Sequence, residues 1–194
     1  MKKIAIDIDN TICDTTDYFG KVAERFDKEV LHKNNVINYN RAVPRSDEWT
    51  EEETNLFFRT EFINEQLNIP IKKDVSLYLQ KIKELGYEIV FITTRGYGID
   101  YDAEGITKEF FKKNNILYDK LLTRVLEKYE YLDGYDYFID DFIKQCEGAL
   151  NNSSCKVIMM SALSNKEYTN DRIKKVNNWK EIYKYIISND KNEK

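Results

Sequence analysis

Short apolar runs alternate along the chain with longer stretches in which apolar residues recur at helical spacing. Residues 3–8 form the first run, and later runs are "YEIVFITT", "KLLT", "YFI" and "KVIMM". Runs this short, rich in β-branched and aromatic residues, predict buried strands, and the stretches between them predict helices. Strands that alternate with helices predict an α/β fold, with a central parallel sheet flanked by helices.

The segment after the first strand does not follow this alternation. Apolar residues at helical spacing predict a helix over residues 15–30, and Thr50 with Glu53 forms a capping-box pattern before a second helix. We interpret this two-helix segment as a small helical cap inserted after the first strand. The expected division is a core domain of residues 1–13 and 74–188, a cap of residues 14–73, and a frayed tail of residues 189–194.

Composition narrows the class of protein. The chain has 194 residues, 42% of them hydrophobic and 33% charged, which is ordinary for one soluble globular unit. Its net charge of −4 gives no long-range attraction to a nucleic acid polymer or an anionic membrane. No apolar run is long enough to span a membrane or to form a signal-peptide core, so we expect a cytoplasmic protein. Three scattered cysteines and one histidine argue against a disulfide framework and a cysteine-based zinc site.

Polar side chains that can do chemistry follow three of the predicted strands. They are Asp7 with Asp9, Thr93 with Arg95, and Asp140 with Asp141. The carboxyl ends of parallel strands share one edge of the sheet, where ligands bind in such folds. We therefore expect these side chains to lie close together.

Four carboxylates at one edge repel one another unless a cation or a raised pKa offsets their charge. Hard oxygen ligands beside a phosphate suit Mg²⁺, so a magnesium phosphate site explains the cluster. A calcium loop starting at Asp7 would need glycine and glutamate where the chain has Ile12 and Tyr18. We therefore favour Mg²⁺.

The strand and motif "IAIDIDNTI" resembles the DxDx(T/V) signature of the haloacid dehalogenase (HAD) superfamily of phosphotransferases. The later markers follow in order: a strand ending in threonine ("VFITT"), a lysine, and the acidic pair of "YFIDD". The resemblance covers roughly residues 1–160 and implies a Rossmann-like HAD fold with a cap. Within the superfamily, "VFITTRG", "ITKEFFKKNNILYDKLL" and "YFIDDF" are similar to the 5'(3')-deoxyribonucleotidase group. Asn10 departs from that group, which usually has glycine there.

The resemblance implies roles for the acidic residues. Asp7 would be the nucleophile that forms an aspartyl-phosphate, and Asp9 the general acid and base. The metal ligands would be Asp7, the backbone carbonyl of Asp9, and Asp140. Asp141 would bind the metal through water or orient its neighbour.

Other residues would hold the substrate. Thr93 would contact the phosphate, and so would a lysine, for which Lys128 is preferred to Lys120 because of its position upstream of Asp140. Arg95 is either a second phosphate contact or a surface residue. Phe19 and Trp49 of the cap are candidates for stacking on the rest of the substrate.

These expectations define a hydrolase: a Mg²⁺-dependent phosphomonoesterase, with a nucleoside monophosphate as the substrate favoured by resemblance alone. The alternatives are a phosphatase of another small phosphorylated metabolite, such as a sugar phosphate, and a phosphoacceptor signalling module. A binding or scaffold protein that has lost catalytic activity is disfavoured, because the chain has a polar residue at every position where the motifs expect one. The assembly state is left open, with a homodimer as one option.

Overall fold

The computed structural model describes residues 2–192 and is built around a single large sheet. Six strands, all parallel, lie side by side in the order β5-β4-β1-β6-β7-β8. They are β1 (Lys3–Ile6), β4 (Glu88–Ile92), β5 (Lys120–Leu122), β6 (Tyr137–Asp140), β7 (Lys156–Met160) and β8 (Lys174–Val176). The predicted α/β class with a central parallel sheet is confirmed, and β8 is a strand that the apolar pattern did not indicate.

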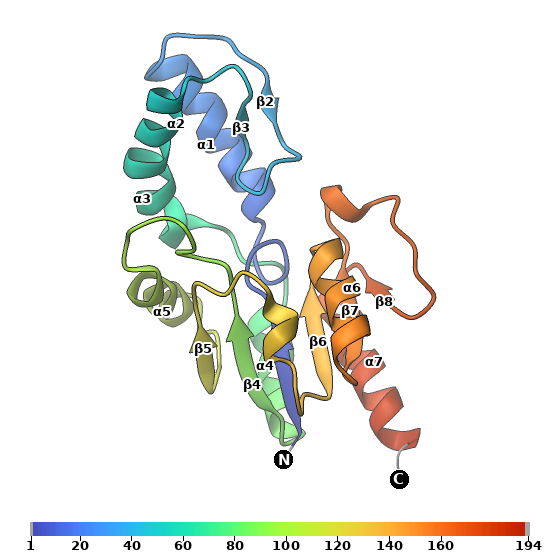
Figure 1. The fold of residues 1–194 in the computed structure, drawn as a ribbon. Helices are drawn as coiled ribbons and strands as arrows, with labels where there is room; N and C mark the ends of the chain where they lie inside the picture. The colour runs from blue at the N-terminus through green and yellow to red at the C-terminus, as the bar shows by residue number, and fades with distance from the viewer. Residues whose placement is uncertain (1, 193–194) are drawn as a thin grey trace.

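Helices cover both faces of the sheet (Figure 1). Ile4 and Ile6 pack in one hydrophobic cluster, and Ala5 between them packs in another, because successive side chains of a strand point to opposite faces. The first cluster takes in α4 (Val75–Glu84), α5 (Ala103–Lys113) and α7 (Trp179–Asn192), and the second takes in α6 (Ile143–Asn152) and the 3₁₀ turn η3 (Lys128–Tyr131). The strands are thus buried on both faces, as their nearly continuous apolar runs predicted.

The register of the central strands aligns their carboxyl ends. Ile6 lies opposite Phe91 of β4 on one side and Ile139 of β6 on the other. The ladder continues for one more bond, because the Asp7 amide donates to the Ile139 carbonyl at 2.9 Å. The residues that follow β1, β4 and β6 therefore meet at one edge of the sheet.

The inserted segment forms a separate layer beyond that edge, above the arrowheads of the strands in Figure 1. Its elements are α1 (Thr15–Glu29), the two-stranded ribbon of β2 (Ile37–Asn38) and β3 (Arg45–Ser46), α2 (Glu51–Phe57), the π turn η1 (Phe58–Phe62), α3 (Ile63–Glu65) and the 3₁₀ turn η2 (Gln66–Asn68). The Thr50–Glu53 capping box is present at the start of α2. The ribbon lies in a polar segment in which the sequence shows no clear period.

The end of the chain differs from the sequence-based expectation. Helix α7 continues to Asn192, where we expected a frayed tail from residue 189. Asp190 holds this turn against the core, because its carboxylate accepts bonds from the Lys2 ammonium at 2.6 Å and the Tyr87 hydroxyl at 2.8 Å. Residues 193–194 lie outside the described residues. Between residues 2 and 192, none of the helices has the length and apolar character that crossing a membrane requires.

Candidate active site

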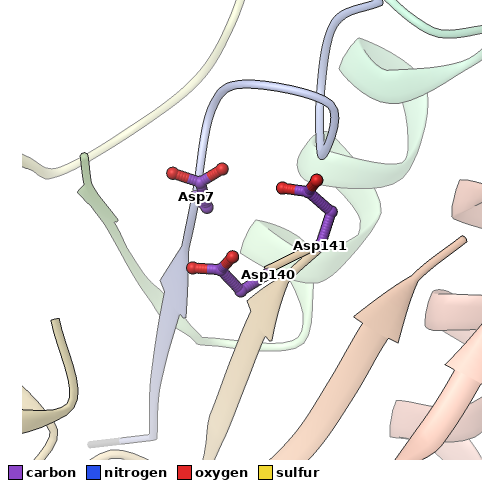
Figure 2. Close-up of side chains that lie close together, drawn as sticks. All are labelled: Asp7, Asp140 and Asp141. Carbon is purple, nitrogen blue, oxygen red and sulfur yellow. The ribbon is translucent and has the colours of Figure 1, made fainter. Parts of the chain in front are cut away.

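Three carboxylates converge at the edge of the sheet (Figure 2). Asp7 follows β1, Asp140 ends β6, and Asp141 comes next in the chain; one oxygen of each lies within 4.8 Å of the others. All three residues are buried. The structure therefore brings together Asp7, Asp140 and Asp141, as their positions at strand ends predicted.

Lys128 supplies the positive charge in this cluster. Its ammonium lies 2.5 Å from Oδ1 of Asp7 and 2.7 Å from Oδ2 of Asp140, and its side chain is only 4% exposed. The Gln145 side chain on α6 fixes the start of this turn, because its Oε1 accepts the Lys128 amide at 2.9 Å. Lys120, the alternative lysine, is instead exposed and pairs with Glu88.

One ammonium does not balance three buried carboxylates. Burial raises the pKa of Asp7 to about 7, and the neighbouring carboxylates add to this effect while Lys128 opposes it. Burial and the charges of Asp140 and Asp7 also raise the pKa of Asp141 well above its usual range. A divalent cation would remove this repulsion, and three closely spaced carboxylates are the hard oxygen donors that Mg²⁺ prefers. The residues present thus fit the predicted metal.

Asp9 lies apart from the three and pairs with Arg95. The guanidinium donates twice, from Nε to Oδ2 at 3.0 Å and from Nη2 to Oδ1 at 2.7 Å. The Thr15 hydroxyl at the start of α1 donates to the same Oδ1 at 2.7 Å. Burial tends to raise the pKa of Asp9, but the Arg95 and Thr15 bonds outweigh it and hold the pKa below its usual value. Arg95 is therefore buried and is not a surface residue, and its alternative role as a second phosphate contact stays a prediction.

Asn10 has a structural reason to differ from glycine. Its φ of 57° lies in the left-handed region, which asparagine tolerates better than most residues. Its Oδ1 accepts the Thr16 amide at 2.9 Å and so satisfies one of the free N–H groups at the start of α1. A hydrogen bond between Asn10 and Asp141 also counteracts the rise in the pKa of Asp141.

The two threonines that follow β4 lie in different environments. Thr93 is fully buried, and its hydroxyl accepts the Arg95 amide at 3.3 Å. Thr94, which the sequence did not single out, lines the cavity beside the acidic cluster, whereas Thr93 is not among the lining residues. The assignment of Thr93 as a phosphate contact therefore stays a prediction. Its neighbour Thr94 is the threonine that lies at the cavity wall.

A cavity of about 540 Å³ opens from the acidic cluster toward the cap. Phe19 of α1 is among the residues around it but is fully buried, so its contact with the substrate stays a prediction. Trp49 does not line the cavity: it is 7% exposed, stacks edge-on against Phe26, and donates its indole N–H to Asp27 at 2.7 Å. Trp49 is a core residue of the cap, and the expectation that it binds substrate is corrected.

The cavity wall includes residues that sequence reasoning missed. Phe62, at the end of the π turn η1, and Tyr101, in the loop before α5, lie edge to face with ring centroids 6.4 Å apart. Gln66 is buried beside them and donates from Nε2 to the Tyr101 hydroxyl at 2.9 Å. π turns are frequent at functional sites, but no sequence pattern distinguishes one from an ordinary helix. These residues join the cap to the core loop at the wall of the cavity.

Comparison with solved structures places this architecture among known folds. A predicted phosphatase from Clostridium acetobutylicum has a TM-score of 0.67 at 14% identity, over 96% of this chain and 98% of that one. A predicted phosphoglycolate phosphatase from Haemophilus somnus has a TM-score of 0.66 at 15% identity, over 96% and 98%. A putative HAD-hydrolase from Bacillus subtilis, described as bound to magnesium, has a TM-score of 0.60 at 10% identity, over 95% and 98%.

No protein-family model and no curated protein matches the chain. Similarity at 10–15% identity establishes the fold and leaves the choice of substrate open. The chain has the fold of the haloacid dehalogenase superfamily, as the motifs in its sequence indicated.

Proposed function

We propose that the protein is a Mg²⁺-dependent phosphomonoesterase in which Asp7 is the nucleophile. The observation that carries this proposal is the environment of Asp7, whose carboxylate lies among two further carboxylates and a buried ammonium. A carboxylate placed in this way can approach a phosphate only if positive charge offsets the repulsion between them. Lys128 supplies part of that charge.

In the first step, an oxygen of Asp7 forms a bond to phosphorus while the bond from phosphorus to the ester oxygen breaks. Lys128 binds Oδ1 of Asp7, and the Thr11 hydroxyl lies 3.4 Å from Oδ2. Both contacts orient the carboxylate. Asp9 would deliver a proton to the departing alcohol.

In the second step, water attacks the phosphorus of the aspartyl-phosphate and releases inorganic phosphate. Asp9 takes the proton from that water, and the regenerated Asp7 returns to its bond with Lys128. The Arg95 and Thr15 contacts favour the ionised form of Asp9, which is the form that accepts a proton in this step. The proton that Asp9 gains here is the one that it delivers to the leaving alcohol in the next cycle.

Asp7, Asp140, Asp141 and the backbone of Asp9 would hold the metal. When bound, Mg²⁺ would supply positive charge that stabilises the transferring phosphoryl group. The magnesium described for the Bacillus subtilis protein of the same fold is consistent with this role.

For the substrate, we favour a nucleoside monophosphate over a smaller sugar phosphate. The cavity volume of about 540 Å³ lies within the range of pockets that hold molecules of nucleotide size. Phe62 and Tyr101, which are partly exposed, give it an aromatic wall on which a base can stack. A sugar phosphate would leave much of this wall uncovered.

Phosphate release with and without Mg²⁺ tests the activity, first on p-nitrophenyl phosphate and dUMP. We expect wild type to need Mg²⁺ and Asp7→Asn to lose at least about 10³-fold in kcat while keeping its circular dichroism spectrum. Equal turnover by Asp7→Asn would contradict the proposal. Slow labelling of Asp7 by acetyl phosphate without turnover would instead favour a phosphoacceptor module.

A panel of phosphorylated metabolites then tests the substrate class. We expect deoxyribonucleoside and ribonucleoside monophosphates to give higher kcat/KM than hexose or pentose phosphates. A preference for the free sugar phosphates would keep the phosphatase and overturn the nucleotide assignment.

A further inference from the structure

Two exposed aromatic side chains line the cavity and have no partner in the part of the chain that the structure describes. Tyr97 is 53% exposed and Phe142 is 51% exposed. Neither ring stacks on another ring or lies under a cation there, and neither packs against a hydrophobic cluster. We call these two residues the mouth pair. Large apolar side chains left bare beside a cavity indicate a surface that binds another molecule.

Phe142 occupies a helix position that usually carries a polar residue. It is the N-cap of α6, and its side chain makes no capping hydrogen bond. Serine, threonine, asparagine or aspartate at an N-cap stabilises a helix by about 0.5–2 kcal/mol relative to a residue without a capping oxygen. Helix stability therefore does not explain a phenyl ring at this position, whereas contact with a bound molecule does.

Hydrogen bonds hold the backbone of the mouth pair beside the acidic cluster. The Phe142 amide donates to Oδ1 of Asp140 at 2.8 Å. The loop that carries Tyr97 is held by Arg124, whose Nη1 donates to the Gly96 carbonyl at 2.8 Å. These bonds do not involve the two aromatic side chains, so the rings stay available to a molecule in the cavity.

The two loops of the mouth pair flank the proposed nucleophile. Tyr97 follows β4 and Phe142 follows β6, and β1, which leads to Asp7, lies between those strands (Figure 1). Neighbouring strands lie about 4.8 Å apart, so β4 and β6 are roughly 10 Å apart. A phosphate at Asp7 therefore has a loop with an exposed aromatic residue on either side. The atoms directly beyond the ester oxygen are the ones that these rings can contact.

This position indicates which leaving group suits the mouth pair. In an aryl phosphate the aromatic ring begins directly beyond the ester oxygen, whereas the sugar separates the base of a nucleotide from that oxygen. Exposed rings offer faces and edges on which an aromatic leaving group can stack. The base of a nucleotide would instead reach the wall formed by Phe62 and Tyr101.

We propose that Tyr97 and Phe142 are specificity-determining residues that hold an aromatic leaving group, and that the protein therefore also hydrolyses aryl phosphates. The reaction is the one proposed above. Asp7 forms a bond to phosphorus, the bond from phosphorus to the aryl oxygen breaks, and the phenol leaves with the proton that Asp9 delivers. This inference rests on the proposed phosphatase activity and adds a second class of substrate to it.

Two phosphate esters test it: 2-naphthyl phosphate, and ethyl phosphate, which has no ring. In wild type we expect KM for 2-naphthyl phosphate to be lower by roughly 5-fold or more, because a stacked ring is worth about 1–3 kcal/mol. Phe142→Ser and Tyr97→Ser should each reduce kcat/KM for 2-naphthyl phosphate by roughly 5-fold or more beyond any change for ethyl phosphate. Comparing each variant with wild type on the same ester cancels the difference in reactivity between the esters. Tyr97→Phe keeps the ring and should restore the preference.

Tyr131 provides a matched control, because it is as exposed as Phe142 but does not line the cavity. Tyr131→Ser should change neither ester. Phe142→Ser keeps the amide that binds Asp140 and adds a capping oxygen, so its melting temperature should be no lower than that of wild type. A fall in melting temperature with equal losses for both esters would make Phe142 a structural residue and overturn the inference.

Other outcomes separate this inference from the phosphatase proposal. A loss for 2-naphthyl phosphate in Phe62→Ala but not in Phe142→Ser would assign the aromatic leaving group to the wall at the cap and overturn the inference alone. Equal KM values for the two esters in wild type, or hydrolysis of dUMP without hydrolysis of 2-naphthyl phosphate, would also overturn it alone. Failure of wild type to hydrolyse any of these esters would instead overturn the phosphatase proposal, and this inference with it.

Discussion

Lys128 reaches Asp7 across 121 positions of the sequence, with its ammonium 2.5 Å from Oδ1 of the carboxylate. The same ammonium lies 2.7 Å from Asp140, so one cation joins the ends of β1 and β6. A phosphate that approaches Asp7 must come close to this ammonium. In the proposed reaction, Lys128 would therefore both order the acidic cluster and offer charge to the substrate.

Replacement of Lys128 by methionine should reduce kcat/KM by about 10²–10³-fold, because the transferring phosphoryl group loses a charged donor. It should also lower the melting temperature of the metal-free protein, since Asp7 and Asp140 lose their counter-charge. Lys120→Met is the matched control, because Lys120 is exposed and its salt bridge within the described part of the chain is to Glu88. Loss of activity in Lys120→Met with retention in Lys128→Met would reverse this assignment.

The metal-free protein should become more stable when Asp141 is replaced by asparagine. Asp141 is buried beside Asp7 and Asp140 and has no salt bridge among residues 2–192. Removing its charge should raise the melting temperature without metal by roughly 3–8 °C, and should reduce the further rise caused by Mg²⁺. Asp140→Asn should do the opposite without metal, because it weakens the Lys128 contact and the bond to the Phe142 amide.

The repulsion among the buried carboxylates also determines how the stability of the metal-free protein changes with pH. The ordinary pKa of an aspartate side chain is 3.8, whereas the pKa of Asp7 is about 7 in the folded metal-free protein. Between these values the folded protein holds a proton that the unfolded chain lacks, so the metal-free protein should lose stability as pH rises toward and through 7. Thermal melts in EDTA at about pH 6 and pH 8 check this, with Asp7→Asn expected to flatten the trend. A steeper trend in Asp7→Asn would contradict it.

The placement of the acidic cluster could be predicted because it depends on sheet geometry alone. Short apolar runs identified β1 and β6, and parallel strands bring their carboxyl ends to one edge. That is why Asp7 and Asp140 were expected together although 133 positions separate them. The pattern of apolar residues does not show which lysine joins the acidic cluster, because it does not distinguish Lys120 from Lys128. Only the spacing of the HAD motifs favoured Lys128.

The aromatic residues of the cavity wall could not be predicted in the same way. Trp49 and Phe62 are both aromatic residues of the cap, yet Trp49 turns to Asp27 within the cap and Phe62 turns to the cavity. The difference depends on partners distant in sequence and on the π turn η1, which shifts the phase of the helix. Helical spacing shows that such residues are buried, but not whether they pack in a core or line a site.

Phe62→Ala should weaken binding of a nucleoside monophosphate more than it affects small phosphates. Loss of a stacking ring costs about 1–3 kcal/mol per base, so KM for dUMP should rise roughly 5–150-fold while kcat/KM for p-nitrophenyl phosphate changes less. Phe58→Ala is the control, because Phe58 belongs to the same π turn but is not among the residues that line the cavity. Equal effects of the two variants on dUMP would mean that the ring acts through cap stability instead.

Asn10 offers a separate test of how the loop after β1 is held. Asn10→Gly removes the bond to the Thr16 amide but suits the left-handed backbone, whereas Asn10→Ala removes the same bond and strains a residue with φ of 57°. Chemical denaturation without metal should therefore show Asn10→Ala less stable than Asn10→Gly by about 1 kcal/mol, even though glycine gains more freedom in the unfolded chain. Both variants should also weaken Mg²⁺ binding, because the Asn10 contact that supports ionised Asp141 is lost in each. If Asn10→Gly proved the less stable variant, the greater freedom of glycine in the unfolded chain would outweigh the strain that φ of 57° imposes on alanine.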